Sequence, residues 1–573
     1  MGMRGAKAKV GVAIAAACAM LLAACSGGLH TLGDPQELQL VASQEAKSDE
    51  LREGGTVKLP IAELPTQYNP MQVDARADAD LAVTLAQFVT VRNWNMASDG
   101  SVKPNPDFVQ KIEVKENPAE GVAMQLVFSL NPKAKWNSGE PITWADYEAT
   151  WKACKENPAN MGTADPDEHW LCASTEGYAQ VAKVAEGSNE YEVLIDYAEA
   201  QPDWQATWAT VNPADGTVDP SVFNTGWRDY RGAAKFQTGP FKILNADKKK
   251  RVITLAPNAA WWGEKPKLEA IQLVAINPGT QAQAFANGEI DVITGIRDVE
   301  DLEKVSQRQD AVIQVARGAQ WRHLTLNARA GIFQDQKLRQ AIAMGINRSE
   351  IAKSDLEGLP IDPESALMGH HFLIPGQAGY ADHALKYDPE AAAKLIEAAG
   401  YKMNEKSGFY EKEGEPLSFT FQRLPGTFPS DNEAKLIKEQ LERIGVQVHY
   451  QDASSSDFFN NIFSGDYQAT TFTWEGTEYP AQLAALTYGE KGANNFTGYS
   501  DPRIEEAIAK LSGTLDAKER VAVLNELDEY VWEGATVIPL YHRAQIDAVA
   551  GGLVNWRTGA FGSGAGALLG WVK

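Results

Sequence analysis

Short apolar segments alternate with amphipathic helices through the second half of the chain, and this alternation limits the fold more than any other feature. Acidic N-cap residues mark the helix starts, at Asp388, Asp431, Asp501 and Asp516. Strand-like runs lie before, between and after them, at 417–421, 446–450, 469–474 and 537–541. Strands interleaved with helices predict an α/β protein, in which helices cover a sheet.

The first half of the chain is richer in strands than the second. Extended segments are predicted at 56–59, 125–130, 191–196, 241–244, 251–255 and 271–275. The chain has 573 residues, of which 44% are hydrophobic, so it is globular but too long for a single core. We therefore expect two or three lobes.

The composition and the motif search exclude several functional classes. The formal net charge of −23 disfavours nucleic acid, whose phosphates need a basic surface. The chain contains no G-x-S-x-G, H-E-x-x-H or P-loop motif, and the glycine-rich run 562–567 follows no clear strand. We read that run as a turn segment, and we expect a protein that is not an enzyme and that needs no cofactor or metal.

The N-terminus has the pattern of a secretory signal. Arg4, Lys7 and Lys9 precede an apolar run at 10–22, which is too short to span a bilayer. The sequence Leu-Ala-Ala-Cys that ends at Cys25 resembles the lipobox of bacterial lipoproteins. That resemblance implies a signal peptide at 1–24 and a lipidated tether at 25–53, which holds the protein on the outer face of the cell membrane. The alternative is an ordinary signal peptide with an unmodified cysteine.

Two further cysteines, Cys154 and Cys172, flank a turn-rich loop. Outside the cytoplasm, the redox conditions favour a disulfide between them. Two free thiols are the alternative. A metal site that uses His169 and Cys172 is disfavoured, because no second ligand pair is evident.

Several segments, in order, resemble the family 5 extracellular solute-binding proteins of ABC importers, which bind oligopeptides and dipeptides. The segment 126–152 resembles the family hallmark, with Thr143 and Asp146 capping a helix. FQTGPFKI at 236–243, FANGEIDV at 285–292 and the block at 326–352 resemble later family motifs. The resemblance covers about residues 54–545.

This resemblance implies a two-lobed periplasmic-binding-protein-like fold of type II, cluster C, with an extra inserted domain. Lobe I would comprise 54–87, 205–318 and 546–573; the inserted domain 88–204; and lobe II 319–545. Crossover strands are expected near 316–321 and 541–546. Ligand would bind between the lobes, and a monomer would deliver it to an ABC transporter permease.

The loop FTWEGTEYPAQLA, at 472–484, carries the main candidate site. In peptide binders of the family, this loop has a tryptophan followed three residues later by an aspartate that holds the ammonium group of the peptide. Here Trp474 matches, but Thr477 replaces the aspartate, and Glu475 and Glu478 flank it. Either glutamate could bind the amine, or the ligand lacks a free amine. A surface turn with solvated acids is the other interpretation.

Six further residues are candidates for ligand contact: Trp321, His323, Asn494, Asn495, Tyr68 and Asn69. Packing between the lobes, helix capping and turn formation explain them equally well.

The sequence thus predicts a lipid-anchored extracytoplasmic protein that captures peptides, with oligopeptides favoured. The alternative keeps the fold but changes the solute to a metal chelate, a glycan or an envelope lipid intermediate, or makes the protein a regulatory lipoprotein. An extracytoplasmic enzyme is the third possibility.

Overall fold

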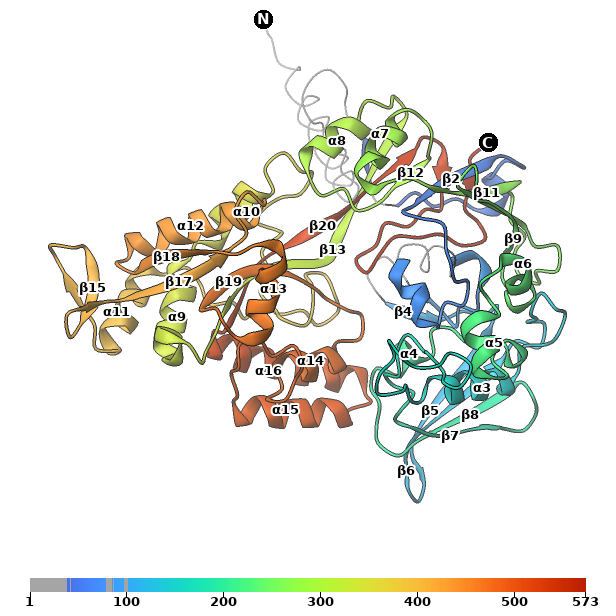
Figure 1. Ribbon diagram of the computed structural model, residues 1–573, viewed down its shortest axis with the longest axis horizontal. Helices are drawn as coiled ribbons and strands as arrows, with labels where there is room; N and C mark the ends of the chain where they lie inside the picture. The colour runs from blue at the N-terminus through green and yellow to red at the C-terminus, as the bar shows by residue number, and fades with distance from the viewer. Residues whose placement is uncertain (1–38, 42, 79–84, 86, 97–100) are drawn as a thin grey trace, which may run out of the picture.

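The computed structural model describes residues 39–41, 43–78, 85, 87–96 and 101–573. The predicted signal peptide and Cys25 lie outside these residues. Within them, the chain forms three sheet-based bodies (Figure 1). Lobe II lies at the left of the view, and lobe I and the inserted domain lie at the right.

Lobe II contains most of a seven-stranded sheet in the order β12-β20-β13-β19-β17-β18, with β1 paired to β13; β12, β1 and the adjoining ends of β13 and β20 lie on the lobe I side. The strand bounds are β1 Gln39–Val41, β12 Val292–Ile293, β13 Ala311–Leu326, β17 Ser418–Arg423, β18 Gln447–Asp452, β19 Ala469–Glu475 and β20 Val537–Ala550. A small three-stranded sheet contains β14 Lys402–Asn404, β15 Phe409–Lys412 and β16 Glu415–Pro416.

Eight helices pack with this sheet, and their caps largely match the sequence. They are α9 Gln336–Gly345, α10 Arg348–Asp355, α11 Pro389–Ala398, α12 Ser430–Arg443, α13 Ser455–Ser464, α14 Pro480–Tyr488, α15 Pro502–Gly513 and α16 Ala517–Gly534. The predicted N-caps Asp388, Asp501 and Asp516 each accept a backbone N–H bond. The fourth prediction is wrong by position, since α12 begins before Asp431, whose carboxylate instead binds Arg423.

Lobe I contains a four-stranded sheet in the order β2-β11-β10-β9. Its strands are β2 Thr56–Ile61, β9 Phe241–Asp247, β10 Val252–Pro257 and β11 Ala270–Ala275, and the C-terminal segment adds β21 Leu553–Val554 and β22 Gly570–Trp571. The helices are α5 Pro220–Thr225, α6 Tyr230–Ala233, α7 Gln281–Ala286 and α8 Val299–Val305. Alternate residues of β2, β10 and β11 are buried, because one face of the sheet covers the core.

The inserted domain is a four-stranded antiparallel sheet in the order β5-β6-β8-β7. It contains β5 Val109–Ala119, β6 Val122–Leu130, β7 Val181–Glu186, β8 Glu192–Tyr197, α3 Trp144–Cys154 and α4 Trp204–Thr207, and a ribbon of β3 Trp94–Met96 and β4 Val102–Pro104 adjoins it. Thr143 and Asp146 form the predicted capping box of α3. Burial raises the pKa of Asp146 to about 6, although backbone N–H bonds oppose this.

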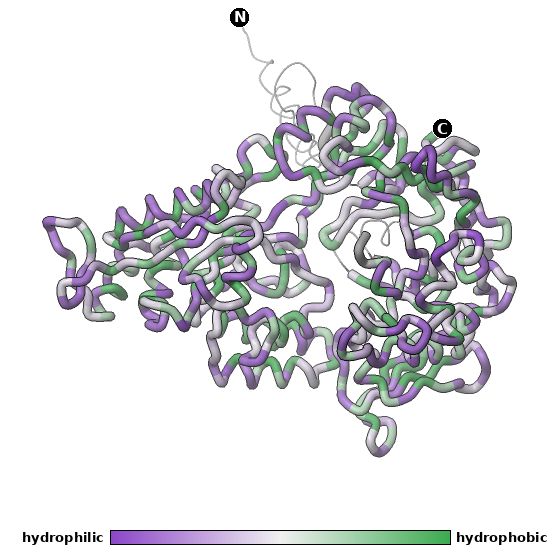
Figure 2. Tube along the Cα trace, viewed as in Figure 1, coloured by the Kyte–Doolittle hydropathy of each residue, from purple (hydrophilic) through white to green (hydrophobic). Residues whose placement is uncertain are grey.

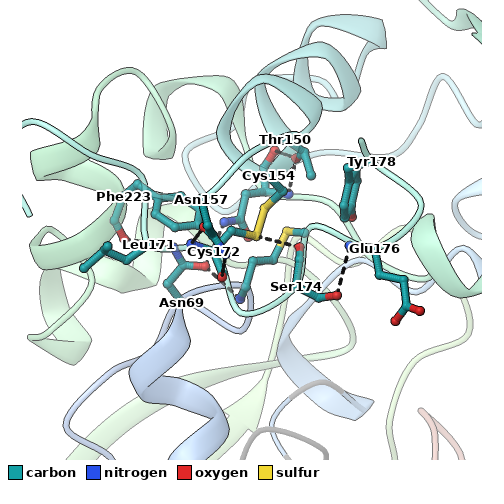
Figure 3. Close-up of a disulfide and its surroundings, with 12 residues drawn as sticks. Asn69, Thr150, Cys154, Asn157, Leu171, Cys172, Ser174, Glu176, Tyr178 and Phe223 are labelled. Carbon is teal, nitrogen blue, oxygen red and sulfur yellow. Dashed lines mark hydrogen bonds between the residues drawn. A yellow bond between two sulfur atoms is a disulfide. The ribbon is translucent and has the colours of Figure 1, made fainter. Parts of the chain in front are cut away.

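The structure pairs Cys154 and Cys172 in a disulfide with a Cα–Cα distance of 5.3 Å (Figure 3). Asn157 closes the intervening loop, because its side chain exchanges two hydrogen bonds with the backbone of Cys172. The bridge therefore connects the end of α3 to the segment that leads to β7.

Two long strands, β13 and β20, run from lobe I into lobe II (Figure 1). Their antiparallel pairing breaks between Arg317 and Trp321. Gly318 lies in this break, where an added Cβ would lie 2.3 Å from the carbonyl oxygen of Arg543. The expected crossovers at 316–321 and 541–546 fall on these two strands.

Residues 43–53, which the sequence places in the tether, pack against the C-terminal segment. The backbone N–H of Ala46 donates to Asn555 Oδ1 at 2.8 Å, and that of Arg52 donates to the carbonyl of Trp571 at 2.9 Å. Leu51 is 2% exposed. A buried leucine and paired backbone groups make this stretch part of the folded body, which a polar composition alone did not indicate.

Hydrophilic residues recur along the outer helices, while the strands between them are paler or green (Figure 2). Among the described residues, no helix combines the length and apolar character needed to span a membrane.

Candidate ligand-binding cleft

A cavity of about 1120 Å³ lies where lobe I, the inserted domain and one loop of lobe II meet. Lobe I contributes the C-terminal segment 555–557 and 561–569, and Arg92 at the start of the inserted domain lies beside it. Asp107 of the inserted domain and Glu264 of lobe I add acidic groups to the wall. Lobe II contributes Glu478 and Tyr479. The volume is slightly larger than the roughly 300–1,000 Å³ that ligand pockets usually enclose.

The lobe II loop is fixed at both ends. The N–H of Gly476 donates to the carbonyl of Ala319 at 2.9 Å, which ties the end of β19 to the crossing strand β13. Thr477 Oγ1 accepts the N–H of Tyr479 at 3.1 Å, and Pro480 then begins α14. This geometry directs the chain between them to the cavity.

The structure separates the two candidate glutamates. Glu478 lines the cavity, where burial raises the pKa of its carboxyl; Thr477 and Arg557 oppose this effect, and the charge of Glu475 adds to it. Glu475 is exposed and is not among the cavity residues. Its charge instead acts on Arg297, whose pKa burial and Arg543 lower.

Trp474 belongs to an aromatic cluster behind the loop. Its ring centroid lies 5.8 Å from that of Trp321, 5.0 Å from that of His323 and 6.0 Å from that of Tyr488. Trp474 is half-buried, whereas Trp321 and His323 are 1% and 0% exposed. Burial lowers the pKa of His323 well below its ordinary value, so the ring is neutral. In the described part of the chain, these rings support the loop and do not line the cavity.

Asn69 and Asn495 are engaged by the protein itself. Asn69 is fully buried, where its Nδ2 donates to the carbonyl of Phe223 at 2.9 Å and its Oδ1 accepts from Asn212. Asn495 Nδ2 donates to the carbonyls of Gly489 and Tyr499. The Asn495 contacts are local ones that form a turn, whereas those of Asn69 connect segments that are distant in the sequence.

The two remaining candidates, Tyr68 and Asn494, are also not among the described lining residues of the cavity. Burial raises the pKa of Tyr68 to about 12, and Asn494 is half-buried. Of the ten candidate residues, the structure brings Glu478 to the cavity wall and places Thr477 directly beside it.

Sequence reasoning missed the opposite wall, which the C-terminal segment and Arg92 form. The sequence predicts a turn segment for the run GSGAGA at 562–567 and does not indicate a ligand-facing wall. Its density of glycine was the available signal, because glycine permits a close approach of backbone to a ligand or to a side chain.

A second contact joins the two halves of the molecule beside the loop. Asp203, at the end of the inserted domain, accepts the N–H of Gln482 at 2.8 Å, at the start of α14. Nearby, Arg520 Nη1 donates to the carbonyl of Pro202 at 3.4 Å. Asp203 is 5% exposed, and burial raises its pKa. The lobes therefore touch at the cavity edge as well as along β13 and β20.

One cluster in lobe II has the residue types of a metal site. Ligand atoms of His370, His383 and Asp528 lie within 4.8 Å of one another. However, Asp528 already accepts from His371 and His383, and His370 Nδ1 accepts two backbone N–H groups. Although burial alone raises the pKa of Asp528, these imidazoles lower it to about 2. We read the cluster as a hydrogen-bonded network within lobe II.

The fold and the shared cavity define a two-lobed solute-binding protein of type II, cluster C. The model of the bacterial extracellular solute-binding proteins, family 5, matches residues 120–496, which is more than half of the chain, and the chain belongs to this family. Proteins of this family act outside the cytoplasm as binding components of ABC importers and are not enzymes.

Sequence similarity to known relatives extends over most of the chain. Oligopeptide-binding protein OppA of Mycobacterium tuberculosis is 29% identical over 514 residues, which cover 88% of this chain and 83% of OppA.

Two solved structures have the same fold. The periplasmic EDTA-binding protein EppA gives a TM-score of 0.73 at 23% identity, covering 90% of this chain and 95% of EppA. AppA of Bacillus subtilis, in complex with a nonapeptide, gives a TM-score of 0.60 at 18% identity, covering 88% of this chain and 96% of AppA.

Proposed function

We propose that the protein captures peptides, with oligopeptides favoured, in the cavity between its lobes and delivers them to an ABC transporter permease. The observation that carries this proposal is the composition of the cavity wall. Both lobes contribute to it, and it presents several carboxylates, among them Glu478, two guanidinium groups and a stretch of glycine-rich backbone. An extended peptide has a charged group at each end and polar backbone groups between them.

Each part of this wall suits a part of a peptide. Glu478 would hold the ammonium group, because a buried carboxylate is costly unless a cation meets it. Main-chain groups of 562–569 could pair with the peptide backbone, which gives affinity without selecting side chains. Trp474 would keep the loop in position, and its exposed face would meet the ligand when the lobes close.

The relative OppA, which is named as an oligopeptide-binding protein, supports the same solute. Within this proposal, Cys25 carries lipid and anchors a monomer to the outer face of the cell membrane. Metabolic labelling with a palmitate analogue tests the anchor: wild type should be labelled, and Cys25→Ala should not. Labelling of both proteins would contradict it.

A second candidate solute is a metal chelate that bears several carboxylates. EppA, which is named as an EDTA-binding protein, has the same fold, and the two arginines on the cavity wall suit such a ligand. The two candidates share carboxylate chemistry, but only the peptide needs an ammonium site.

Isothermal titration calorimetry with pools of synthetic tripeptides to nonapeptides tests the proposed function. We expect saturable binding at one site per chain. Absence of heat with every pool, together with binding of Fe(III)-EDTA, would replace the peptide by the chelate.

A further inference from the structure

Two arginines, Arg92 and Arg557, line the cavity. Arg92 Nη1 donates to the carbonyl of Ala565 at 3.2 Å, and Arg557 Nη1 donates to that of Gly562 at 3.5 Å. Neither arginine takes part in the ion pairs found among the described residues, in which N and O lie within 4.0 Å. A guanidinium carries five N–H donors in a planar fork, so most of these donors remain available.

The glycine-rich segment builds the wall that holds these arginines. Gln87 fixes the segment, because its Oε1 accepts the N–H of Ala565 at 2.6 Å and its Nε2 donates to the carbonyl of Ser563 at 3.3 Å. A Cβ on Gly564 would lie 2.5 Å from Gln87 Oε1, so glycine permits this approach. The run GSGAGA thus places backbone carbonyls beneath Arg92 and Arg557.

The positive charges of the two arginines are only partly balanced by nearby carboxylates, which favours binding of an anion beside them. Burial and the charge of Arg557 lower the pKa of Arg92. Burial likewise lowers the pKa of Arg557, and the carboxylates of Glu478 and Asp547 oppose this only in part. Asp547 is fully buried and accepts from neutral donors, among them Trp556 Nε1 and Thr558 Oγ1.

Other acids lie on the same cavity wall. Glu45, Asp107 and Glu264 also line it. Burial and the neighbouring charge of Glu264 raise the pKa of Asp107. They form no ion pair with Arg92 or Arg557 within 4.0 Å in the part of the chain that the structure describes. The described part of the cavity wall therefore carries both acids and unpaired guanidinium groups, and Glu478 is the acid whose charge acts on Arg557.

We propose that Arg92 and Arg557 form an anion subsite that binds a carboxylate of the solute. Guanidinium groups bind carboxylates through two parallel N–H···O bonds, and partial burial strengthens such bonds. For a peptide, this group is the C-terminal carboxylate; for a chelate, it is one of the ligand carboxylates. The subsite deepens the proposed function and rests on it for the location of the solute.

The test uses the full-length protein and three probes: a pool of pentapeptides with free C-termini, the same pool with C-terminal amides, and Fe(III)-EDTA. Affinities are measured by calorimetry for wild type, Arg92→Gln and Arg557→Gln. Arg231→Gln is the matched control, because Arg231 is an exposed lobe I arginine outside the cavity lining. Thermal unfolding checks that each variant folds. If a glutamine variant does not fold, the double variant Arg92→Lys, Arg557→Lys, which keeps both positive charges, replaces it.

We expect wild type to bind the free pentapeptides roughly 10- to 100-fold more tightly than the amides, the range for a charged hydrogen-bonded group. Each glutamine variant should lose most of that preference, while the control keeps it. The lysine variant should retain part of it, since ammonium groups lack the bidentate fork.

The outcomes separate the two proposals. If wild type binds both pools equally, or if the glutamine variants keep the preference, the anion subsite is wrong and peptide capture stands. If wild type binds Fe(III)-EDTA alone and loses it in the arginine variants, peptide capture is wrong and the subsite stands. Binding of none of the three probes would overturn both.

Discussion

The two walls of the cavity are held by the same residue but are built in opposite ways. The N–H of Ala319 donates to the carbonyl of Ala560 in the C-terminal segment, and its carbonyl accepts the N–H of Gly476 in the lobe II loop. Behind that loop, aromatic rings pack on one another. On the C-terminal wall, Arg92 and Arg557 keep free donors. The lobe II wall is fixed by side-chain packing, whereas the C-terminal wall has hydrogen-bond donors that are available to a ligand.

If the proposed anion subsite is right, the loop identifies the family and the arginines choose the solute. The loop with Trp474 resembles the family, yet most of its side chains contact the protein itself. The arginines belong to no family motif that the sequence shows, and they carry the unpaired charge.

The largest expected effect is on the packed wall. Trp474→Ala should lower the free energy of unfolding by about 3 kcal/mol and should weaken peptide binding strongly, because the loop loses the rings that support it. Urea denaturation and calorimetry measure the two quantities. Trp474→Phe should recover most of both. An alanine variant that binds peptide as wild type does would remove Trp474 from the site.

Glu478 tests whether the packed wall also contributes a charge. Glu478→Gln should weaken binding of peptides with a free amino terminus by about 2 kcal/mol, and should leave N-acetylated peptides nearly unchanged. The matched control is Glu475→Gln, which alters an exposed carboxylate outside the cavity lining. Equal effects of the two variants would contradict the separation of these glutamates.

The pH dependence of binding follows from the same carboxyl. Because burial raises the pKa of Glu478, its charged form is lost at a higher pH than for an ordinary glutamate. Affinity for a free-amine peptide should therefore fall as the pH is lowered through that raised pKa, and Glu478→Gln should flatten this part of the profile. Calorimetry between pH 4 and 7, roughly around the ordinary glutamate pKa, measures it. An unchanged profile in the variant would assign the titration elsewhere.

The smallest effect is expected at the hydrogen bond between Asp203 of the inserted domain and Gln482 of lobe II, which lies at the edge of the cavity. Asp203→Ala removes the carboxylate that accepts the N–H of Gln482 at the start of α14, and should weaken peptide binding by about 1 kcal/mol. Glu199→Ala, an exposed neighbour in the same segment, is the control and should change nothing. Calorimetry compares both with wild type. An Asp203 variant with wild-type affinity would show that this contact does not help to hold the loop.

The sequence predicted what is local and missed what is distant. Caps such as Asp388 and Asp516 bind backbone groups two or three residues away, so their signals are contiguous. The capping box of Thr143 and Asp146 was predicted for the same reason. By contrast, Arg92 reaches Ala565, which is 473 positions away, and no periodicity links two such segments.

The candidate site shows the same limit. Glu478 was proposed from the family loop, but the loop alone could not distinguish it from Glu475, because the difference in burial depends on residues of the other lobe. The packing of residues 43–53 on the C-terminal segment was also missed. Its partners, Asn555 and Trp571, lie at the far end of the chain.

Native mass spectrometry of the full-length protein with a defined pentapeptide pool tests the central claim, that the two lobes hold a solute between them without altering it. We expect a complex of one peptide per chain, from which the peptide is released with its mass unchanged after prolonged incubation. Fragments of the peptide, or a spectrum of the unliganded chain at every peptide concentration, would contradict that claim.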